Sequence, residues 1–356
     1  MAAARVRPLV TVLLPCYNAA RYLAASLESL VNQTYAALEI LAIDDGSTDA
    51  TGKILAEFAR RDARVRLAPN DRNRGLIYTL NRGVALATGS LIARMDADDV
   101  SLPQRIERQA EYFERFPETQ LLSSDVSYIR EDGELLYDPV VHRFSDSTLR
   151  FPMFFTNPIC HPTIMARTST MRSFEYSPSA VHSEDFELWT RMLEHGVVFR
   201  NVPERLLRFR PNLASVSTRH FAQQSATFLR VSAAAMKKYF DFDIDPDVHR
   251  ILTARMSHGD VRGSKLREAM RLFHYMWREY VRRESLSRDN AAVVTRFALA
   301  HIAKVLHLAY RRSASEDPAR GAAAWGLLRV GMRSPGSVLQ LVVNRLRSRA
   351  RDSQGD

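Results

Sequence analysis

Cysteine is scarce in this chain, whose 356 residues include only Cys16 and Cys160. Two cysteines cannot build a disulfide framework, so a reducing, cytosolic setting is favoured. They also give no support for a metal site made of paired cysteines. Hydrophobic residues make up 46% of the chain and charged residues 25%. This composition excludes a disordered chain and indicates a folded, globular protein.

Long uncharged apolar runs are also absent. Residues 9–14 are apolar and follow two arginines, as in a signal peptide, but the run is short and Pro15 follows at once. We therefore interpret it as a buried first strand. Residues 291–310 come closest to the length of a membrane span, and Arg296 and Lys304 interrupt them. The sequence accordingly predicts no transmembrane helix.

Four motifs that mark common enzyme classes do not occur. The sequence has no Walker A loop, no Gly-x-Gly-x-x-Gly, no Gly-x-Ser-x-Gly and no His-Glu-x-x-His. Their absence disfavours a P-loop phosphoryl transferase, a dinucleotide oxidoreductase, an α/β-hydrolase and a zincin protease.

Acidic residues are few in the C-terminal third. Residues 248–351 carry 21 Lys and Arg against 7 Asp and Glu, whereas residues 1–247 carry 29 against 31. The net charge of +10 therefore belongs to the C-terminal third. Nucleic acid or an anionic membrane surface would suit such a region. A solvated helical face explains the same charge equally well.

The first 100 residues alternate between strand and helix patterns. Apolar runs predict strands at residues 9–14, 38–43, 65–67 and 91–95, and apolar residues at helical spacing predict a helix after each of the first three. This order predicts an α/β fold with a mostly parallel central sheet, helices on both faces and right-handed crossovers.

Beyond residue 120 the pattern is mixed. We predict strands at residues 121–129, 163–166, 197–199 and 206–209, a turn at 131–134 and a helix at 184–193. From about residue 219 the pattern is mainly helical, and the Asp-rich segment 241–247 suggests a hinge. We therefore predict two domains, residues 1–218 and a basic, mainly helical region of residues 219–356.

Polar clusters follow three of the predicted strands, at residues 15–18, 44–47 and 96–99. Ligands of such sheets bind beyond the carboxyl ends of the strands, so the clusters predict one shared site. The last cluster contains Asp96, Asp98 and Asp99. Carboxylates are the ligands that Mg²⁺ and Mn²⁺ prefer. The alternative is a polar turn with a helix N-cap.

Five other residues near the predicted site have both a functional and a structural interpretation. Asp44 and Asp45 can bond a nucleobase or a ribose hydroxyl, or can form an Asx turn. Tyr17 can stack on a base or belong to the core. Glu184 and Asp185 begin the predicted helix, where an Asp can act as a general base or simply complement the helix dipole.

Three histidines have no metal-ligand spacing and are interpreted as packing or substrate-contact residues. They are His161, His182 and His195.

Together these segments resemble family 2 glycosyltransferases with a GT-A fold. The matching text is VTVLLPCYN at residues 10–18, SLVNQTY at 29–35, IDDGSTD at 43–49, NRGL at 73–76, ARMDADD at 93–99 and SEDFELW at 183–189. The resemblance covers about residues 8–215 and does not extend to the basic tail.

The resemblance implies a role for each cluster. It implies a nucleotide-sugar site formed by Pro15, Tyr17, Asn18, Asp44, Asp45, Arg74, Asp96 and Asp98, in which Asp45 contacts a uracil base. It implies a Mn²⁺ or Mg²⁺ site at Asp98 and Asp99 and a catalytic base at Asp185. It places His161, Glu184 and Trp189 on the acceptor side.

The implied activity is an inverting, metal-dependent transfer of one sugar from a nucleotide-sugar, most simply a UDP-sugar, to an acceptor hydroxyl. Processive synthases of the family carry a Gln-x-x-Arg-Trp motif and transmembrane helices, which this sequence lacks. The implied acceptors are cell-surface polysaccharides or lipid-linked glycans. We expect a cytoplasmic enzyme, or one held peripherally on the inner face of the cytoplasmic membrane.

Two other classes of protein are the alternatives. A sugar nucleotidyltransferase would share the fold and the metal chemistry, but it would carry a Gly-rich basic loop after the first strand, which residues 15–22 do not provide. A non-catalytic nucleic-acid-binding protein would use the basic C-terminal region, where aromatic residues for base stacking are sparse.

Overall fold

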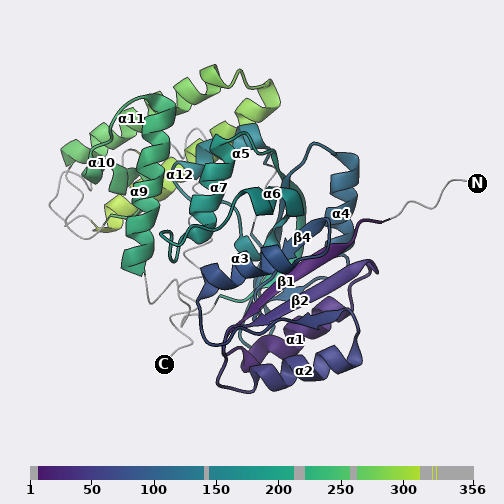
Figure 1. The fold of residues 1–356 in the computed structure, drawn as a ribbon. Coiled ribbons are helices and arrows are strands. Elements are labelled where there is room, and N and C mark those ends of the chain that lie inside the picture. The colour runs from purple at the N-terminus through teal and green to yellow at the C-terminus, as the bar shows by residue number, and fades with distance from the viewer. Residues whose placement is uncertain are drawn as a thin grey trace, which may run out of the picture. The chain divides into compact units, whose positions relative to one another are not determined.

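The computed structural model describes residues 7–139, 144–211, 221–256 and 263–312, together with Ala323 and Gly326. The chain forms two compact units (Figure 1). The first unit comprises Met1–Asp146 and Ile159–Thr227, and the second comprises Ser147–Pro158 and Phe228–Asp356. The boundary predicted between residues 218 and 219, and most of the basic tail after residue 312, lie outside the described residues.

Nine strands form one sheet in the first unit, in the order β3-β2-β1-β4-β8-β6-β9-β5, with β7 paired to β6. The strands are β1 (Val10–Cys16), β2 (Leu38–Asp44), β3 (Val65–Leu67), β4 (Leu91–Arg94), β5 (Val100–Ser101), β6 (Leu121–Ile129), β7 (Leu135–Tyr137), β8 (Met165–Arg167) and β9 (Phe199–Phe209).

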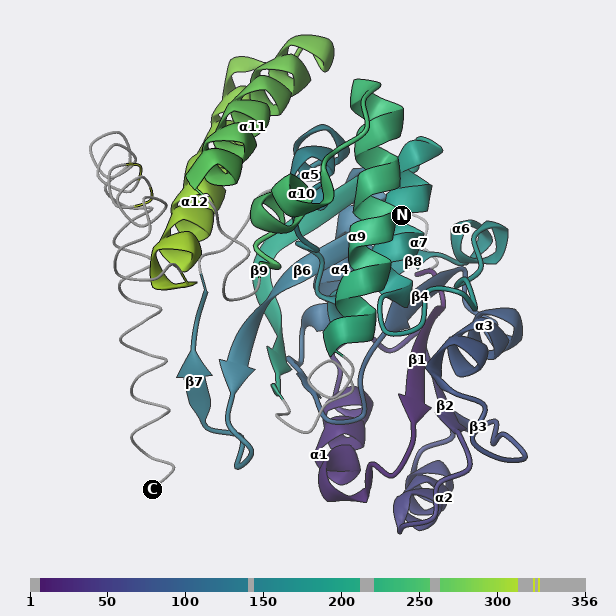
Figure 2. The ribbon, with the colours of Figure 1, turned by 90° about the vertical axis from the view of Figure 1, so that its left-hand side faces the viewer.

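The half of the sheet built from the first 100 residues is parallel, as the sequence predicts. β1 pairs in parallel with β2 and β4, and β2 pairs in parallel with β3, so these strands lie side by side (Figure 2). In the other half, β8 runs antiparallel to β4 and β6, while β9 is parallel to β6. The predicted α/β class with a mostly parallel central sheet is confirmed, with one antiparallel strand inserted at its middle.

The two late strands predicted at 197–199 and 206–209 are in fact one strand, β9. Its pairing with β6 shifts between Ser124 and Asp125, where Val202 and Arg205 are the successive partners. Pro203 and Glu204 lie in this irregularity. A proline has no N–H for a ladder hydrogen bond, so a bulge accommodates it without ending the strand.

Helices cover both faces of the sheet. Those of the first unit are α1 (Ala20–Val31), α2 (Thr51–Arg61), α3 (Leu76–Leu86), α4 (Arg105–Arg115), α6 (Thr168–Ser173), α7 (Glu184–Glu194) and the short 3-10 helix η1 (His161–Thr163).

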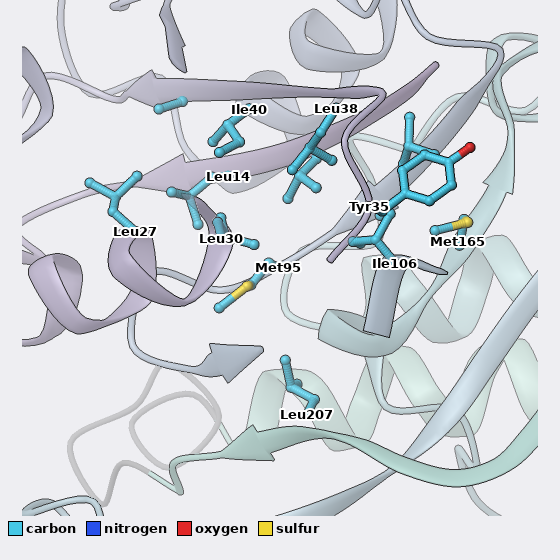
Figure 3. Close-up of a cluster of buried hydrophobic side chains, with 14 of the residues drawn as sticks. Leu14, Leu27, Leu30, Tyr35, Leu38, Ile40, Met95, Ile106, Met165 and Leu207 are labelled. Carbon is cyan, nitrogen blue, oxygen red and sulfur yellow. The ribbon is translucent and has the colours of Figure 1, made fainter. Parts of the chain in front are cut away.

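Alternate residues of β1 explain why both faces are covered. Val12 and Leu14 pack in one hydrophobic cluster with Leu27 of α1. Leu14 and Leu27 of this cluster are labelled in Figure 3. Leu13 points to the opposite face, where α3 approaches so closely that a Cβ on Gly83 would lie 2.2 Å from its Cδ1. A strand buried on both sides needs the continuous apolar run that the sequence contains.

The second unit is helical and has its own aromatic core. Its helices are α5 (Asp146–Met153), α9 (Phe221–Phe240), α10 (Pro246–Leu252), α11 (Gly263–Arg283) and α12 (Arg288–Arg312), of which α5 and α9 begin in residues of the first unit. Phe151 makes ring contacts with Phe155 at 5.2 Å and with Phe273 at 5.7 Å between centroids. The Tyr280 hydroxyl donates to the Ser147 carbonyl at 2.6 Å. The segment Ser147–Pro158 thus completes the core of a unit whose other members come more than 70 residues later.

The hinge predicted at residues 241–247 is wrong as a boundary between the two parts. The segment lies inside the second unit, where it joins α9 to α10. Asp245 caps α10 by accepting from the N–H groups of Asp247 and Val248. The acidic residues that suggested a linker are therefore partly helix-capping residues.

Helix α12 is long and apolar enough, by length and composition alone, to cross a membrane, with a mean hydropathy of 1.4 over its most apolar window. One face of it is buried, through Val294, Ala298 and Leu306, in the core of the second unit. A core helix of a globular domain passes the same test, so the finding does not by itself indicate a membrane span.

Candidate active site

The loops that follow β1 and β2 are held together by side-chain hydrogen bonds. Asn18 Oδ1 accepts from the Thr48 N–H at 2.9 Å, and the Asn18 N–H donates to Ser47 Oγ at 3.0 Å. Asp49 accepts from the N–H groups of Ala20 and Thr51. Asn18 adopts a positive φ of 47°, which asparagine tolerates better than most residues. These bonds bring two of the three predicted polar clusters together.

Asp45 shapes the loop that contains Arg74. Its buried carboxylate accepts from Asn70 Nδ2 at 2.6 Å and from the N–H groups of Arg74 and Gly75 at 2.8 and 2.9 Å. A carboxylate has about four lone-pair sites, so three such bonds leave room for one further donor. The predicted contact between Asp45 and a nucleobase is compatible with this arrangement and stays a prediction.

Gly46 is required by the close approach of the same loop. It has a φ of +71°, and a Cβ at this position would lie 2.5 Å from Arg72 C and Asn73 N. Only glycine combines that backbone conformation with so short a distance between two backbone segments.

The remaining residues of the predicted nucleotide site lie around these loops. Asp44 Oδ1 accepts from the Ser47 N–H at 3.0 Å, which is the Asx turn that the sequence allowed. Tyr17 is 51% exposed, so its ring is accessible to a ligand, and Pro15 is half-buried at the end of β1. The Arg74 guanidinium forms a bidentate pair with Asp71 at 2.9 Å.

The acidic loop after β4 is anchored by a buried arginine. Arg94 forms a bidentate ion pair with Asp96, with nitrogen–oxygen distances of 2.5 and 2.6 Å. The Arg94 side chain is only 4% exposed, whereas that of Asp96 is 31% exposed. Arg94 is itself supported by Arg105, whose Nη2 donates to the Arg94 carbonyl at 2.7 Å.

Asp98 and Asp99 are held by Arg210, the residue that follows β9. The Arg210 N–H donates to Asp99 Oδ1 at 2.9 Å, and its Nε donates to the Asp98 carbonyl at 3.0 Å. The guanidinium also donates to the carbonyls of Arg130 and Glu131 and lies over the Tyr22 ring. One arginine therefore joins the acidic loop to the β6–β7 turn and to α1.

The acidic loop has the properties of a divalent cation site. One carboxylate oxygen from each of Asp96, Asp98 and Asp99 lies within 4.8 Å of the others. Asp99 Oδ2 is buried and has no hydrogen-bond partner. Burial and the charge of Asp96 raise the pKa of Asp98 to about 6, and burial with both neighbouring carboxylates raises the pKa of Asp99 well above its usual range. Crowded carboxylates and an unsatisfied buried oxygen fit a hard cation.

Helix α7 brings a second pair of carboxylates to the same region. Glu184 and Asp185 form its first turn, and Asp185 Oδ1 accepts from the Phe186 N–H at 2.7 Å. Burial, then the charge of Asp185, raises the pKa of Glu184 to about 7, while the charges of Arg94 and Asp96 also act on it. The acidic loop and the start of α7 are therefore within electrostatic reach of each other, 85 residues apart in the chain.

The acceptor-side candidates His161 and Trp189 are largely buried. His161 Nε2 lies 2.9 Å from the Tyr176 hydroxyl, and its ring packs edge-on to Trp189 at 5.6 Å between centroids. Burial, then the charge of Arg94, lowers the pKa of His161 well below its usual range, so the imidazole is neutral. Trp189 is completely buried, so its role in this structure is to pack against the His161 ring.

Sequence reasoning missed three residues that organise this site. Arg94 stands in the apolar run of β4, and a lone charge immediately before three carboxylates was a usable signal. Tyr176 and Arg210 lie 80 and 114 residues from Asp96 and carry no local signal. Only the pairing of β9 with β5 brings Arg210 beside the acidic loop.

The mostly parallel sheet with acidic clusters at its strand ends has the arrangement expected of a GT-A glycosyltransferase, and comparison with known proteins shows the family. Residues 11–177 match the model of glycosyl transferase family 2. An uncharacterized glycosyltransferase of Haemophilus influenzae is 30% identical over 66% of this chain and 75% of its own length. The chain belongs to glycosyltransferase family 2.

Two further relatives have more specific names. The putative glycosyltransferase EpsE of Bacillus subtilis is 33% identical over 60% of this chain and 77% of its own length. The UDP-Glc:alpha-D-GlcNAc-diphosphoundecaprenol beta-1,3-glucosyltransferase WfgD of Escherichia coli is 26% identical over 60% of this chain and 82% of its own. The second of these relatives is named for glucosyl transfer to a sugar on diphosphoundecaprenol.

Solved structures share the fold at low sequence identity. S. aureus TarS 1-349 in complex with UDP gives a TM-score of 0.53 at 14% identity, over 90% of this chain and 88% of that one. The mannosyltransferase PcManGT of Pyrobaculum calidifontis, in complex with GDP-Man and Mn²⁺, gives 0.52 at 17% identity, over 96% and 88%. The predicted GT-A fold with a helical C-terminal region is confirmed.

Proposed function

We propose that this glycosyltransferase transfers a single sugar, with inversion, from a UDP-sugar to a hydroxyl of a lipid-linked or polysaccharide acceptor. The observation that carries the proposal is the meeting of two acidic sites: Asp96, Asp98 and Asp99 at the end of β4, and Glu184 and Asp185 at the start of α7. Leaving-group stabilisation and proton removal need separate groups on the two sides of the reacting carbon.

On the donor side, Asp98 and Asp99 are the residues that would hold Mn²⁺ or Mg²⁺. When bound, the cation would supply neutralisation of the negative charge that develops on the departing nucleoside diphosphate. Arg94 already neutralises the charge of Asp96. A neutralised carboxylate repels ribose or diphosphate oxygens less than a free carboxylate would, so Asp96 suits a contact with them. Tyr17, Asn18, Asp45 and Arg74 lie on the loops that would border the nucleotide.

On the acceptor side, Asp185 would act as the general base. It would take the proton of the attacking hydroxyl while that oxygen bonds to the anomeric carbon and the diphosphate leaves. One displacement of this kind inverts the configuration and requires no covalent sugar–enzyme intermediate. Glu184, whose pKa of about 7 keeps part of it protonated at neutral pH, can donate a hydrogen bond to the acceptor. Neutral His161, packed against the buried Trp189, would shape the wall of this side.

The lipid-linked acceptor class is supported by the family relatives rather than by a feature of the site. One relative is named for transfer to a sugar on diphosphoundecaprenol. We propose the same class of acceptor for this chain, and with it a working place at the cytoplasmic face of a membrane.

The experiment that tests the donor site is calorimetric titration of UDP, with and without Mn²⁺, into the wild-type protein and Asp98→Asn. We expect binding that requires Mn²⁺ and that falls by at least 10-fold in the variant, because a metal ligand is lost. Asp243→Asn, which alters an exposed carboxylate that pairs with Lys237 in the second unit, is the matched control.

Three outcomes separate the parts of the proposal. Binding of GDP or dTDP in place of UDP, with Mn²⁺, would keep the donor site and change the nucleotide. Equal UDP binding with and without Mn²⁺ would show that nucleotide binding does not depend on a metal. If no nucleoside diphosphate bound, the donor site assigned to the acidic loop would be wrong.

A further inference from the structure

Helix α11 carries an exposed basic stripe along its whole length. The stripe consists of Arg267, Arg271, His274, Tyr275, Arg278 and Arg282, all of which are exposed. At 100° per residue these six positions fall within an arc of about 100°, and they span about 22 Å along the axis. The four arginines therefore form one continuous face.

The opposite face of the same helix is fixed in the core of the second unit. Leu266, Phe273, Met276 and Tyr280 are buried there. The rotation of α11 about its axis is therefore set by packing, and the basic stripe must face outward. A hollow with a volume of about 610 Å³ lies along the stripe, lined by Arg271, Tyr275 and Arg278 among others.

Three arginines of the stripe have no acidic partner among the residues that the structure describes. Within the described part of the chain, no ion pair involves Arg267, Arg271 or Arg278.

The two acidic residues at the edge of the stripe already have basic partners. Glu268 pairs with Lys265 at 3.2 Å, and Glu279 pairs with Arg282 and Arg283 at 2.6 Å. The stripe thus keeps its positive charge and offers several guanidinium groups to an external anion.

We propose that the α11 stripe is a membrane-docking surface that binds the phosphate groups of an anionic lipid leaflet. A row of cations on the rigid face of one helix matches a planar array of phosphates. Tyr275, which is 48% exposed in the middle of the row, suits the boundary between headgroups and acyl chains. The choice of a membrane over nucleic acid rests on the proposed lipid-linked acceptor.

The test uses the full-length protein and vesicles that contain no acceptor. Sedimentation is measured with phosphatidylcholine vesicles and with vesicles that also contain phosphatidylglycerol, at low and at high salt. We expect binding only to the anionic vesicles, and loss of that binding at high salt. The variant Arg267→Gln/Arg271→Gln/Arg278→Gln should bind roughly 100-fold more weakly, since each arginine near the surface contributes about a fivefold factor.

A matched control separates the stripe from total charge. Arg60→Gln/Arg61→Gln/Arg115→Gln removes three exposed helical arginines from the first unit and gives the same change in net charge. Glutamine keeps helix propensity close to that of arginine, so both variants are expected to fold. The control variant should bind anionic vesicles like the wild type. Equal losses in the two variants would overturn the proposal, as would wild-type binding to neutral vesicles.

Two further measurements distinguish this proposal from its alternatives. UDP titration should be the same in the stripe variant and the wild type. If UDP binds normally but anionic vesicles do not, the docking surface is wrong and the proposed function stands. If vesicles bind but UDP does not, the proposed function is wrong and the docking surface stands. A stripe variant that loses binding to duplex DNA while keeping vesicle binding would identify nucleic acid as the partner and overturn the membrane assignment.

Discussion

Arg94 shows how a buried charge can organise two halves of a site. Its guanidinium is almost inaccessible to water and pairs with Asp96, and its charge also acts on His161, Tyr176 and Glu184. A buried ion pair of this kind contributes little net stability, because desolvation of both charges offsets their attraction. The pair fixes the position of Asp96, and the charge of Arg94 partly opposes the rise that burial and Asp185 cause in the pKa of Glu184.

Glu184 gives a prediction for the dependence of stability on pH. Its pKa rises from an ordinary 4.5 to about 7 on folding, so the folded state holds its proton more tightly. The stabilising contribution is complete below about pH 4.5 and is lost as the pH rises through about 7. We expect Glu184→Gln to be more stable than the wild type at pH 8 by on the order of 3 kcal/mol, and nearly equal to it at about pH 4.

The measurement is the free energy of unfolding of both proteins by urea across this pH range, without metal or nucleotide. Groups remote from Glu184 titrate alike in the two proteins, so the difference reports Glu184 together with its interaction with Asp185. Glu187→Gln, which alters a partly buried ion pair with Arg191 on the same helix, is the control. A stability difference that stays constant from pH 5 to pH 8 would contradict the raised pKa.

At the scale of elements, the sequence was sufficient for the parallel half of the sheet. The apolar runs at 9–14 and 38–43 correspond to β1 and β2, because strands covered by helices on both faces must be apolar throughout. The run at 121–129 matches β6 in the same way. Local patterns cannot reveal that β8 inserts antiparallel between β4 and β6, since three-residue strands carry almost no periodicity.

The candidate site likewise has a part that the sequence predicts and a part that it does not. The carboxylates at residues 44–45 and 96–99 follow predicted strands, so their position at one edge of the sheet could be expected from topology. Of the residues that hold them, Arg94 carries a usable local signal, whereas Arg210 carries none, because the pairing of β9 with β5 brings it to the acidic loop. Burial of Trp189 also follows from tertiary packing, which the amphipathic pattern of α7 leaves open.

Gly46 allows a test of the loop between β2 and α2. In Gly46→Ala the positive φ and the approach of Arg72 and Asn73 both oppose the new Cβ. We expect a loss of about 3 kcal/mol in the free energy of unfolding, together with weaker UDP binding as the 70–75 loop moves. Chemical denaturation and calorimetry measure the two effects.

Gly196→Ala is the matched control, because Gly196 has a φ of +76° and no atom near the added Cβ. Its loss should be about 1 kcal/mol, from backbone strain alone. Equal losses in the two variants would show that the contact between the loops is unimportant.

At the scale of the whole molecule, the two units cannot be separated by one cut. A chain ending at residue 227 retains Phe151, Phe154 and Phe155 but loses the helices that bury them. Three exposed phenylalanines present about 500 Å² of apolar surface, comparable with the largest patch of a typical monomer. We expect this truncated protein to aggregate, as measured by light scattering and size-exclusion chromatography.

Replacing the three phenylalanines by serine in the truncated chain should restore a monomer, since the rest of the first unit has its own core. A truncated wild-type sequence that stays monomeric and soluble would show that Ser147–Pro158 does not depend on the second unit.

Ser147–Pro158 is synthesised long before the rest of the unit to which it belongs. Phe151 and Phe155 emerge long before α12, whose residues Val305 and Ala309 complete the core that receives them. Roughly 150 residues must be added in between, and at 5–20 residues per second this takes roughly 10–30 s. Throughout that interval the nascent chain carries a phenylalanine-rich segment that its own fold cannot yet shelter. The protein is therefore expected to depend on chaperone capacity during synthesis more than its thermodynamic stability would suggest.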